Sequence, residues 1–179
     1  MPNTKKNTVK TILAETMQDL LYKKPFHKIS VNELCETAGI SRSSFYANFE
    51  DKYQLFSYCM DEQHGKLENL MKSHSPKEFF TVMLDFVQSE SKFFYHAFGS
   101  TYDEEISEIF YRFFDEQFTA ILQEKIQHGF TLSDPVEYVT AFYIGGFSNM
   151  ILRWIKSNYN IPKEELASCQ YHLIKNFMD

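Results

Sequence analysis

The residues best suited to chemistry gather in one short segment, "AGISRSSFYANFEDKYQLF", residues 38–56. It combines hydroxyl, guanidinium, amide and ammonium groups, all of which donate hydrogen bonds, with several aromatic rings. A buried helix has little use for the serines, and a surface loop has little use for the phenylalanines. The mixture predicts a small helical unit whose phenylalanines pack inward while its polar side chains face a partner. The outward-facing candidates are Ser41, Arg42, Ser43, Ser44, Tyr46, Asn48 and Lys52.

Two short helices are expected to position these side chains. Ser30 and Glu33 have the spacing of a capping box, and Gly39 suits a helix end, so residues 31–38 are predicted as one helix. A second helix is expected from Ser41 to about residue 49. Short helices joined by a sharp turn are typical of a helix-turn-helix, and small side chains with donors suit the major groove of DNA.

The rest of the chain is also expected to be helical. Apolar residues recur at three- and four-residue steps, and no alternating strand pattern of useful length occurs. The prediction is an all-α fold of about nine helices, with one domain over residues 1–52 and a second over 53–179. The further helices are expected at 7–23, from 51 to about 73, at 76–89, 91–98 and 103–128, from 135 to about 159, and from 162 to the C-terminus.

Charge is distributed unevenly between these two parts. The chain has a net charge of −6, which by itself argues against a nucleic-acid partner. Residues 1–52, however, hold eight Lys and Arg against six Asp and Glu, whereas residues 53–179 hold ten against eighteen. The net charges are therefore +2 and −8, so only the N-terminal part has a balance that suits phosphate contacts.

The N-terminal segment closely resembles the DNA-binding domain of TetR-family transcriptional regulators. The resemblance implies a homodimer whose second short helix reads the major groove of a double-stranded operator, with the remaining helices serving effector binding and dimerisation. Asn48 stands where a histidine is frequent, and Ser43 and Ser44 stand where glycine and threonine are common, so groove contacts can differ. The resemblance rests on Ile29, Ser30, Val31, residues 38–42, Phe45, Tyr46, Phe49 and Lys52.

The C-terminal part is rich in aromatic residues, which allows two interpretations. One is a pocket for a small apolar or aromatic effector, with tyrosine hydroxyls and His96 as polar anchors; the other is a closed aromatic core. Residues 135–158 and 163–177 are assigned to a dimer interface, and a weaker resemblance links this part to regulators associated with dihydroxyacetone metabolism. The effector candidates are Phe94, His96, Phe98, Tyr102, Phe110, Tyr111, Phe114, Phe147, Met150 and Trp154.

Several classes of protein are not expected. No apolar run approaches the length of about 20 residues that a membrane helix needs, and the first ten residues lack a secretory signal. The six histidines form no metal-binding motif, and no set of catalytic residues or phosphate-binding loop is recognisable. Three widely spaced cysteines favour a reducing cytoplasm. We therefore expect no enzyme activity, metal, cofactor or membrane partner.

The leading hypothesis is a ligand-responsive homodimeric repressor. Effector binding would change the separation of the two reading heads, so that they no longer fit successive major grooves. The alternative is an activator or tether whose C-terminal domain binds a partner protein. An open aromatic cavity would favour the first hypothesis, and a filled core with an exposed apolar patch would favour the second.

Overall fold

The computed structural model describes residues 8–71, 78–99, 103–132 and 134–178. In these ranges the chain forms nine α helices and no strand, which confirms the all-α prediction. Two shorter turns complete the fold, the 3-10 turn η1 (Phe26–Lys28) and the π-helical turn η3 (Tyr95–Gly99). The α helices are α1 (Val9–Leu21), α2 (Val31–Ala38), α3 (Arg42–Tyr46), α4 (Lys52–Met71), α5 (Phe79–Ser89), α6 (Ser91–Phe94), α7 (Glu104–Gln127), α8 (Val136–Lys156) and α9 (Lys163–Met178).

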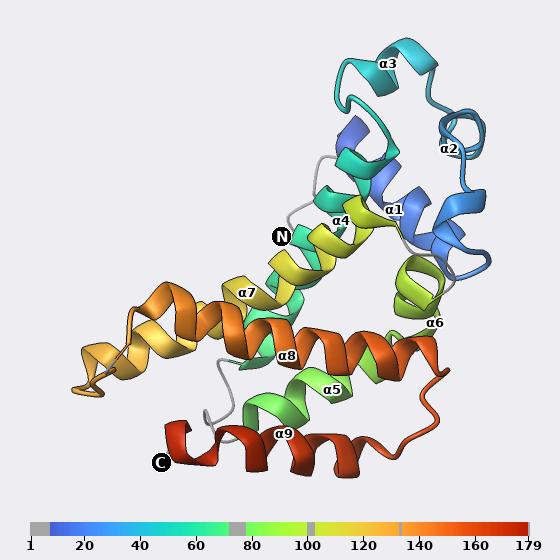
Figure 1. Cartoon of the computed structure of the whole chain (residues 1–179). Helices are drawn as coiled ribbons and strands as arrows, with labels where there is room; N and C mark the ends of the chain where they lie inside the picture. The colour runs from blue at the N-terminus through green and yellow to red at the C-terminus, as the bar shows by residue number, and fades with distance from the viewer. Residues whose placement is uncertain (1–7, 72–77, 100–102, 133, 179) are drawn as a thin grey trace, which may run out of the picture.

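The first three helices form a head at one end of the molecule, with α3 at its extremity (Figure 1). α1 begins where the Thr8 side chain accepts a hydrogen bond from the Thr11 amide, and its apolar stripe, including Leu13 and Met17, is fully buried. α1 packs against α2, α3 and α4. The head therefore obtains its core from the long helices, because helices as short as α2 and α3 are marginal on their own.

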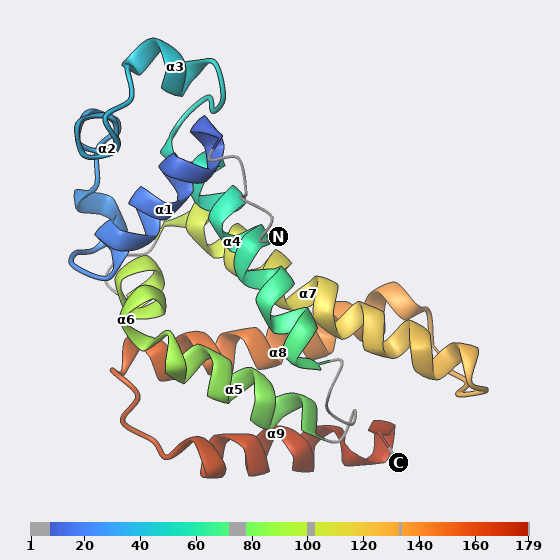
Figure 2. The ribbon, with the colours of Figure 1, turned by 180° about the vertical axis from the view of Figure 1, so that it is seen from behind.

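The C-terminal helices form a layered body beneath the head. α5 lies between α8 and α9 in both views, and α7 packs against α4 and α8 (Figures 1 and 2). The turn that joins α7 to α8 projects away from this body (Figure 1). The long helices α4 and α7 thus connect the head to the part of the molecule where α8 and α9 lie.

One aromatic core runs through both parts. Phe56 on α4 packs against Phe26 of the head, with ring centroids 5.1 Å apart, and against Phe93 and Phe98 at 6.1 and 5.7 Å. Such ring pairs contribute about 0.5–1.5 kcal/mol beyond the area that they bury. The expected boundary between residues 52 and 53 falls in the first turn of α4, so the two parts share a helix and a core.

Residues 91–98 were expected to form one regular helix, but the structure has a change of helix type there. α6 ends at Phe94 and is followed by the π-helical turn η3. At the end of this turn the Tyr95 ring lies over Gly99, where an added Cβ would stand 2.8 Å from a ring carbon. Only glycine permits that approach, and a π turn often marks a functional site.

Two predicted helix ends also differ from the structure, and a third lies outside the described residues. α3 ends at Tyr46 rather than near residue 49, because the Asn48 amide side chain donates to the Ser44 carbonyl and the chain turns. α5 begins at Phe79, and its expected start at residues 75–76 lies outside the described residues. α8 ends at Lys156, before Asn158 and Tyr159 adopt φ values of 55° and 59°. Backbone turns that sequence periodicity does not reveal set these ends.

Candidate nucleic-acid interface

The turn between α2 and α3 is built from local signals. The Ser30 hydroxyl accepts from the Glu33 amide at 3.2 Å and begins α2. At the other end Gly39 has φ +66°, where it donates to Glu36 O at 3.3 Å while Ile40 donates to Cys35 O at 2.9 Å. This pair of bonds is a Schellman motif, which satisfies the last carbonyls of the helix. The turn therefore directs the chain from α2 into α3 at a defined angle.

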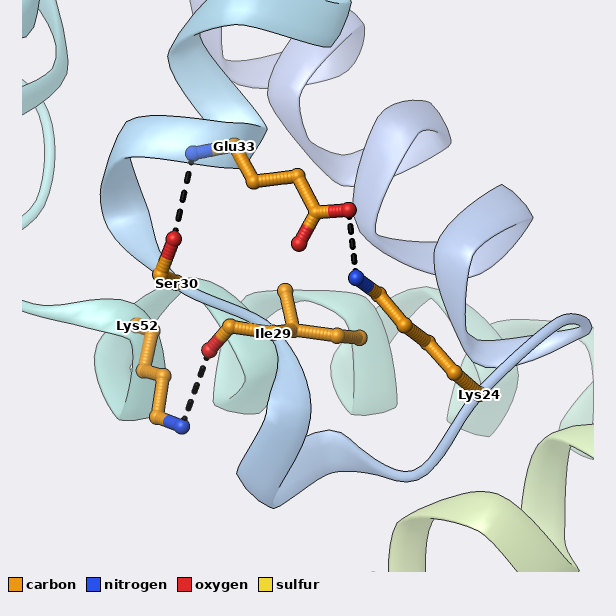
Figure 3. A network of polar contacts seen from close by, with 5 residues as sticks. All are labelled: Lys24, Ile29, Ser30, Glu33 and Lys52. Carbon is orange, nitrogen blue, oxygen red and sulfur yellow. Dashed lines mark hydrogen bonds and ion pairs between the residues drawn. The ribbon is translucent and has the colours of Figure 1, made fainter.

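The predicted capping box is present only in part. In a complete box the glutamate side chain returns to the amide of the capping residue. Here the Glu33 carboxylate forms an ion pair with Lys24, in the connection between α1 and α2 (Figure 3). α2 is thereby tied to the end of α1, which is a tertiary contact that the local pattern did not predict.

α3 has one buried side and one exposed side. Phe45 is fully buried and packs against Phe49, whereas Arg42, Ser43 and Tyr46 are exposed. The Ser41 hydroxyl accepts from the Ser44 amide at 3.2 Å and begins the helix. The exposed side of α3 therefore presents short polar groups, a guanidinium and a phenol on the outermost surface of the head.

Arg42 is held by neighbours on two helices. Its Nη1 donates to the Asn32 side-chain oxygen on α2 at 2.5 Å, and its guanidinium lies 5.8 Å from the Tyr46 ring centroid. Asn32 thus joins the exposed polar surface, although sequence analysis did not select it. Its exposed position in the first turn of α2 was the available signal, but only the crossing of α2 and α3 places it beside Arg42.

The serines form a local hydroxyl cluster. Ser41 Oγ lies 3.0 Å from Ser43 Oγ and 3.0 Å from Ser44 Oγ. Ser41 and Ser43 are exposed, while Ser44 is half-buried. Each hydroxyl can rotate to exchange a neighbour for a phosphate or a base edge, because a hydroxyl both donates and accepts.

Asn48 and Lys52 have different surroundings. Asn48 is half-buried, and its Nδ2 donates to Ser44 O at 2.8 Å. The Lys52 amine donates to Ile29 O at 3.0 Å (Figure 3) and to Phe26 O at 3.2 Å. It also lies 4.4 Å from the Phe26 ring centroid. Burial lowers the pKa of Lys52. In this conformation Lys52 ties α4 to the connection between α1 and α2, so a phosphate contact requires exchange of these bonds.

The aromatic candidates of the C-terminal domain pack mainly against one another. Phe98 and Phe110 rings lie 4.7 Å apart, Phe110 and Phe114 rings 4.8 Å apart, and Phe94 and Phe98 rings 6.1 Å apart. All four of these rings are buried. In this conformation they form a filled core, which is the second of the two interpretations that the sequence allowed.

The other candidates occupy several different places. Tyr111 is half-buried on α7, and Phe147 is buried on the inner face of α8. Met150 and Trp154 line an open groove of about 650 Å³ between α8 and α9, where Trp154 donates to the Ile161 carbonyl. Tyr102 lies outside the described residues. The ten candidates therefore do not surround a common cavity among the residues that the structure describes.

His96 connects the C-terminal domain to the head, and Tyr53 and Asp103 connect α4 to α7. His96 Nδ1 lies 2.6 Å from Leu21 O at the end of α1. On α4, the Tyr53 hydroxyl donates to Asp103 Oδ2 at 2.9 Å, while Asp103 Oδ1 accepts from the Ile106 amide and so caps α7. Burial and this hydrogen bond raise the pKa of Tyr53 to about 12. These contacts fix the orientation of the head on the body.

In the part of the chain that the structure describes, no helix has the length and apolar content needed to cross a membrane. No group of three or more His, Cys, Asp or Glu side chains in those ranges is placed to hold a metal ion.

A short helix-turn-helix on an all-helical body defines a class of protein, the helix-turn-helix DNA-binding proteins. Residues 12–59 match the family model described as "Bacterial regulatory proteins, tetR family", and residues 74–176 match "Transcriptional regulator C-terminal region". The chain belongs to the TetR family of transcriptional regulators.

Individual relatives agree with this assignment. A transcriptional activator of the dhaKLM operon, DhaS of Lactococcus lactis subsp. lactis (strain IL1403), is 32% identical over 68 residues. That match covers 37% of this chain and only 36% of the relative.

Solved structures show the same fold over almost the whole chain. The dihydroxyacetone kinase operon activator DhaS has a TM-score of 0.63 at 18% identity, covering 93% of this chain and 94% of that one. A TetR transcriptional regulator from Streptococcus agalactiae 2603V has a TM-score of 0.69 at 17% identity, covering 92% of each chain. At such identities the likeness concerns the fold alone.

Proposed function

We propose that the protein is a homodimeric regulator that reads a DNA operator with the exposed side of α3. The observation that carries this proposal is the Arg42 guanidinium, held between Asn32 and Tyr46 on the outermost surface of the head. Arginine is well suited to paired hydrogen bonds with guanine in the major groove. Ser41, Ser43 and Ser44 supply further donors beside it, and Asn32 extends the surface onto α2.

Variants of the head test this proposal. Operator sequences are first selected from a random DNA pool with the purified chain. Arg42→Ala then weakens binding to the selected sequence by about 1–3 kcal/mol and relaxes the preference at one base pair. Thr37→Ala on the exposed side of α2 is the control and leaves binding unchanged. Arg42→Ala with unaltered affinity and base preference would reject α3 as the reading helix.

The role of Lys52 is decided by a salt titration. A phosphate contact gives a Lys52→Ala variant whose slope of log K against log salt is smaller by about 0.9. A lysine that only ties α4 to the connection between α1 and α2 gives an unchanged slope and a lower free energy of unfolding. A phosphate contact would therefore change the salt dependence of DNA binding, whereas a purely structural role would change the free energy of unfolding.

We propose that the second copy binds the exposed face of α8 together with α9. Tyr138 and Phe142 are 70% and 75% exposed, and Gly145 and Asn149 continue the same face at helical spacing. An apolar stripe with a glycine suits close helix approach, and a four-helix bundle formed by two copies would cover it. Leu173 on α9 is also exposed, at 62%.

Two matched variants separate dimerisation from DNA reading. Phe142→Glu on α8 gives monomers at micromolar concentration in sedimentation, because a buried unpaired charge opposes association. Tyr46 on α3 is also an exposed aromatic residue, and the Tyr46→Glu variant remains dimeric but loses DNA binding. Cys169 is the exposed cysteine, so its thiol reacts more slowly in the dimer than in the Phe142→Glu monomer. A wild-type monomer in sedimentation would reject the interface.

A second candidate function is activation through a partner protein. Two observations favour it: the aromatic cluster is filled, and the α8 face is apolar and exposed. The Lactococcus lactis relative is also named an activator. Transcription from the selected operator, measured in vitro with and without the protein, gives the sign of regulation. If the wild-type chain forms a dimer that covers α8, this apolar face is not available to another protein. That result would argue against the second candidate function.

A further inference from the structure

One hydrogen bond on the exposed surface of the head joins α2 to α3. Arg42 Nη1 on α3 donates to Asn32 Oδ1 on α2 at 2.5 Å, and both side chains are exposed. A guanidinium only donates, so the asparagine turns its amide oxygen toward Arg42 and keeps its two amide hydrogens for other acceptors. The bond therefore orients both side chains on the surface that the head offers to DNA.

The fold itself gains little from this bond. The angle between α2 and α3 is set by the turn at Gly39 and by the packing of buried residues on both helices, such as Leu34 and Phe45. Water competes for the polar groups of an exposed contact, so such a contact contributes little to stability. The main consequence of the bond therefore concerns the exposed surface rather than the core.

Tyr46 supports the same guanidinium from α3. It follows Arg42 by one helical turn, and Arg42 Nη2 lies 3.5 Å from the Tyr46 hydroxyl oxygen. The Tyr46 ring packs edge-on against the buried Phe45 ring, with centroids 5.3 Å apart, which restricts where the phenol can lie. Arg42 is thus held at one terminal nitrogen by α2 and at the other by α3.

The two contacts leave the pair of donors that a guanine base requires. Each terminal nitrogen of an arginine carries two hydrogens. Asn32 engages one hydrogen on Nη1, and the Tyr46 oxygen lies within reach of one on Nη2. One hydrogen therefore remains on each nitrogen, and two such donors match the O6 and N7 acceptors of guanine in the major groove.

A carboxylate borders the same surface as the guanidinium. Glu36 follows Asn32 by one turn of α2, and both residues line a hollow of about 420 Å³ together with Arg42. Arginine and a carboxylate readily form paired hydrogen bonds. Pairing with Glu36 would occupy the donors of Arg42 and draw the guanidinium against α2. The bond to Asn32 holds the guanidinium in a different arrangement.

We propose that Asn32 is a positioning residue for DNA reading, which holds the Arg42 guanidinium toward a guanine of the operator and away from Glu36. The inference rests on the proposed function of α3, and it assigns part of the base specificity to a side chain of α2. Because the arginine is already ordered in the free protein, less conformational entropy is lost when the guanine is bound. Asn32 acts through Arg42 and needs no contact with the base.

The test uses the full chain and the operator selected from the random pool. Each guanine of the operator is replaced in turn by 7-deazaguanine, which lacks the N7 acceptor. Wild type loses affinity by about tenfold at the guanine that Arg42 reads, and Arg42→Ala loses this sensitivity. In Asn32→Ala the loss falls to about twofold, because the arginine is no longer held in the reading position.

Removing the Glu36 carboxylate tests the second half of the proposal. Glu36→Gln in the Asn32→Ala background restores sensitivity to 7-deazaguanine, because the arginine has lost its competing charged partner. Glu36→Gln alone is the matched control on the same helix. It tightens binding to all sequences, since a negative charge near the phosphates is removed, and leaves the base preference unchanged. A double variant as insensitive as Asn32→Ala would overturn the proposal.

Thermal melts distinguish positioning from a purely structural role. Alanine has the highest helix propensity, so Asn32→Ala folds, with a melting temperature within about 2 °C of wild type. A lower melting temperature together with unaltered sensitivity to 7-deazaguanine would show that Asn32 only joins the two helices, and would overturn the proposal.

Failure of this inference differs from failure of the proposed function. A wild-type chain that is insensitive to 7-deazaguanine at every guanine overturns guanine reading by Arg42, and with it the role of Asn32. If wild type and Arg42→Ala behave as expected while Asn32→Ala keeps the full sensitivity, α3 remains the reading helix and only the role of Asn32 is overturned.

Discussion

Two adjacent aromatic pairs show how differently the head and the C-terminal domain are built. In the head, Phe45 is fully buried while its neighbour Tyr46 is 49% exposed. In the C-terminal domain, the neighbours Phe93 and Phe94 are both fully buried. α3 packs on one side only, whereas α6 contacts α1, α5 and η3. Tyr46 in the head is therefore accessible to a partner, while Phe93 and Phe94 on α6 stabilise the fold.

The largest expected effect on stability comes from removing a buried ring of the C-terminal domain, compared with removing an exposed ring of the head. Phe94→Ala lowers the free energy of unfolding by about 3–5 kcal/mol, because it leaves a cavity among packed rings. Tyr46→Ala changes that free energy by less than about 0.5 kcal/mol, as is usual for exposed positions, but weakens operator binding. Urea denaturation and a DNA-binding titration measure the two effects. Comparable destabilisation by both substitutions would mean that Tyr46 belongs to the core.

Alanine substitutions of Gly39 in the head and Gly145 on α8 are expected to have smaller effects on stability, of opposite sign. Gly39 has φ +66° with free space around it, so Gly39→Ala costs about 1 kcal/mol through backbone strain alone. Gly145 lies in the middle of α8 with open space beside it, so Gly145→Ala stabilises the isolated chain by up to about 1 kcal/mol through helix propensity. Thermal melts of both variants check the opposite signs.

The same glycine substitution on α8 is expected to affect assembly. An added methyl group keeps two α8 helices farther apart, so Gly145→Ala weakens the dimer even as it stabilises the helix. Sedimentation over a range of concentrations measures this. A Gly145→Ala dimer as tight as wild type would place the second copy elsewhere.

An effect of similar size concerns the contact between α4, which supports the head, and the start of α7. Tyr53→Phe removes the hydrogen bond to Asp103 and lowers the free energy of unfolding by about 1 kcal/mol at neutral pH. Because the folded-state pKa of Tyr53 is raised to about 12, its contribution is complete below pH 10 and is lost as pH rises from 10 to 12. Tyr53→Phe therefore flattens the alkaline decline of stability. An unchanged decline would show that another group causes it.

Local signals in the sequence were sufficient to predict much of the head. Ser30 and Gly39 set the bounds of α2 at Val31 and Ala38 as predicted, because capping depends on groups within a few residues of the helix end. The long helices were also predictable from apolar periodicity. The exposed candidates Ser41, Arg42, Ser43 and Tyr46 do lie together on the surface of α3.

Other features depended on contacts between segments distant in the chain. Lys52 was expected to face outward, but carbonyls at Phe26 and Ile29 hold its amine. Asn32 joined the candidate surface only because α2 crosses α3. Composition also could not distinguish an open aromatic pocket from a filled core, since both require the same rings.

The amino-acid order thus determined where α2 begins and ends, which family the chain belongs to, and which short helix carries exposed polar side chains. These properties rest on interactions that span a few residues. The tertiary structure decided that Lys52 turns inward and that the rings around Phe98 close on one another. Such features follow from how surfaces of distant helices fit together, which periodicity and capping signals do not encode.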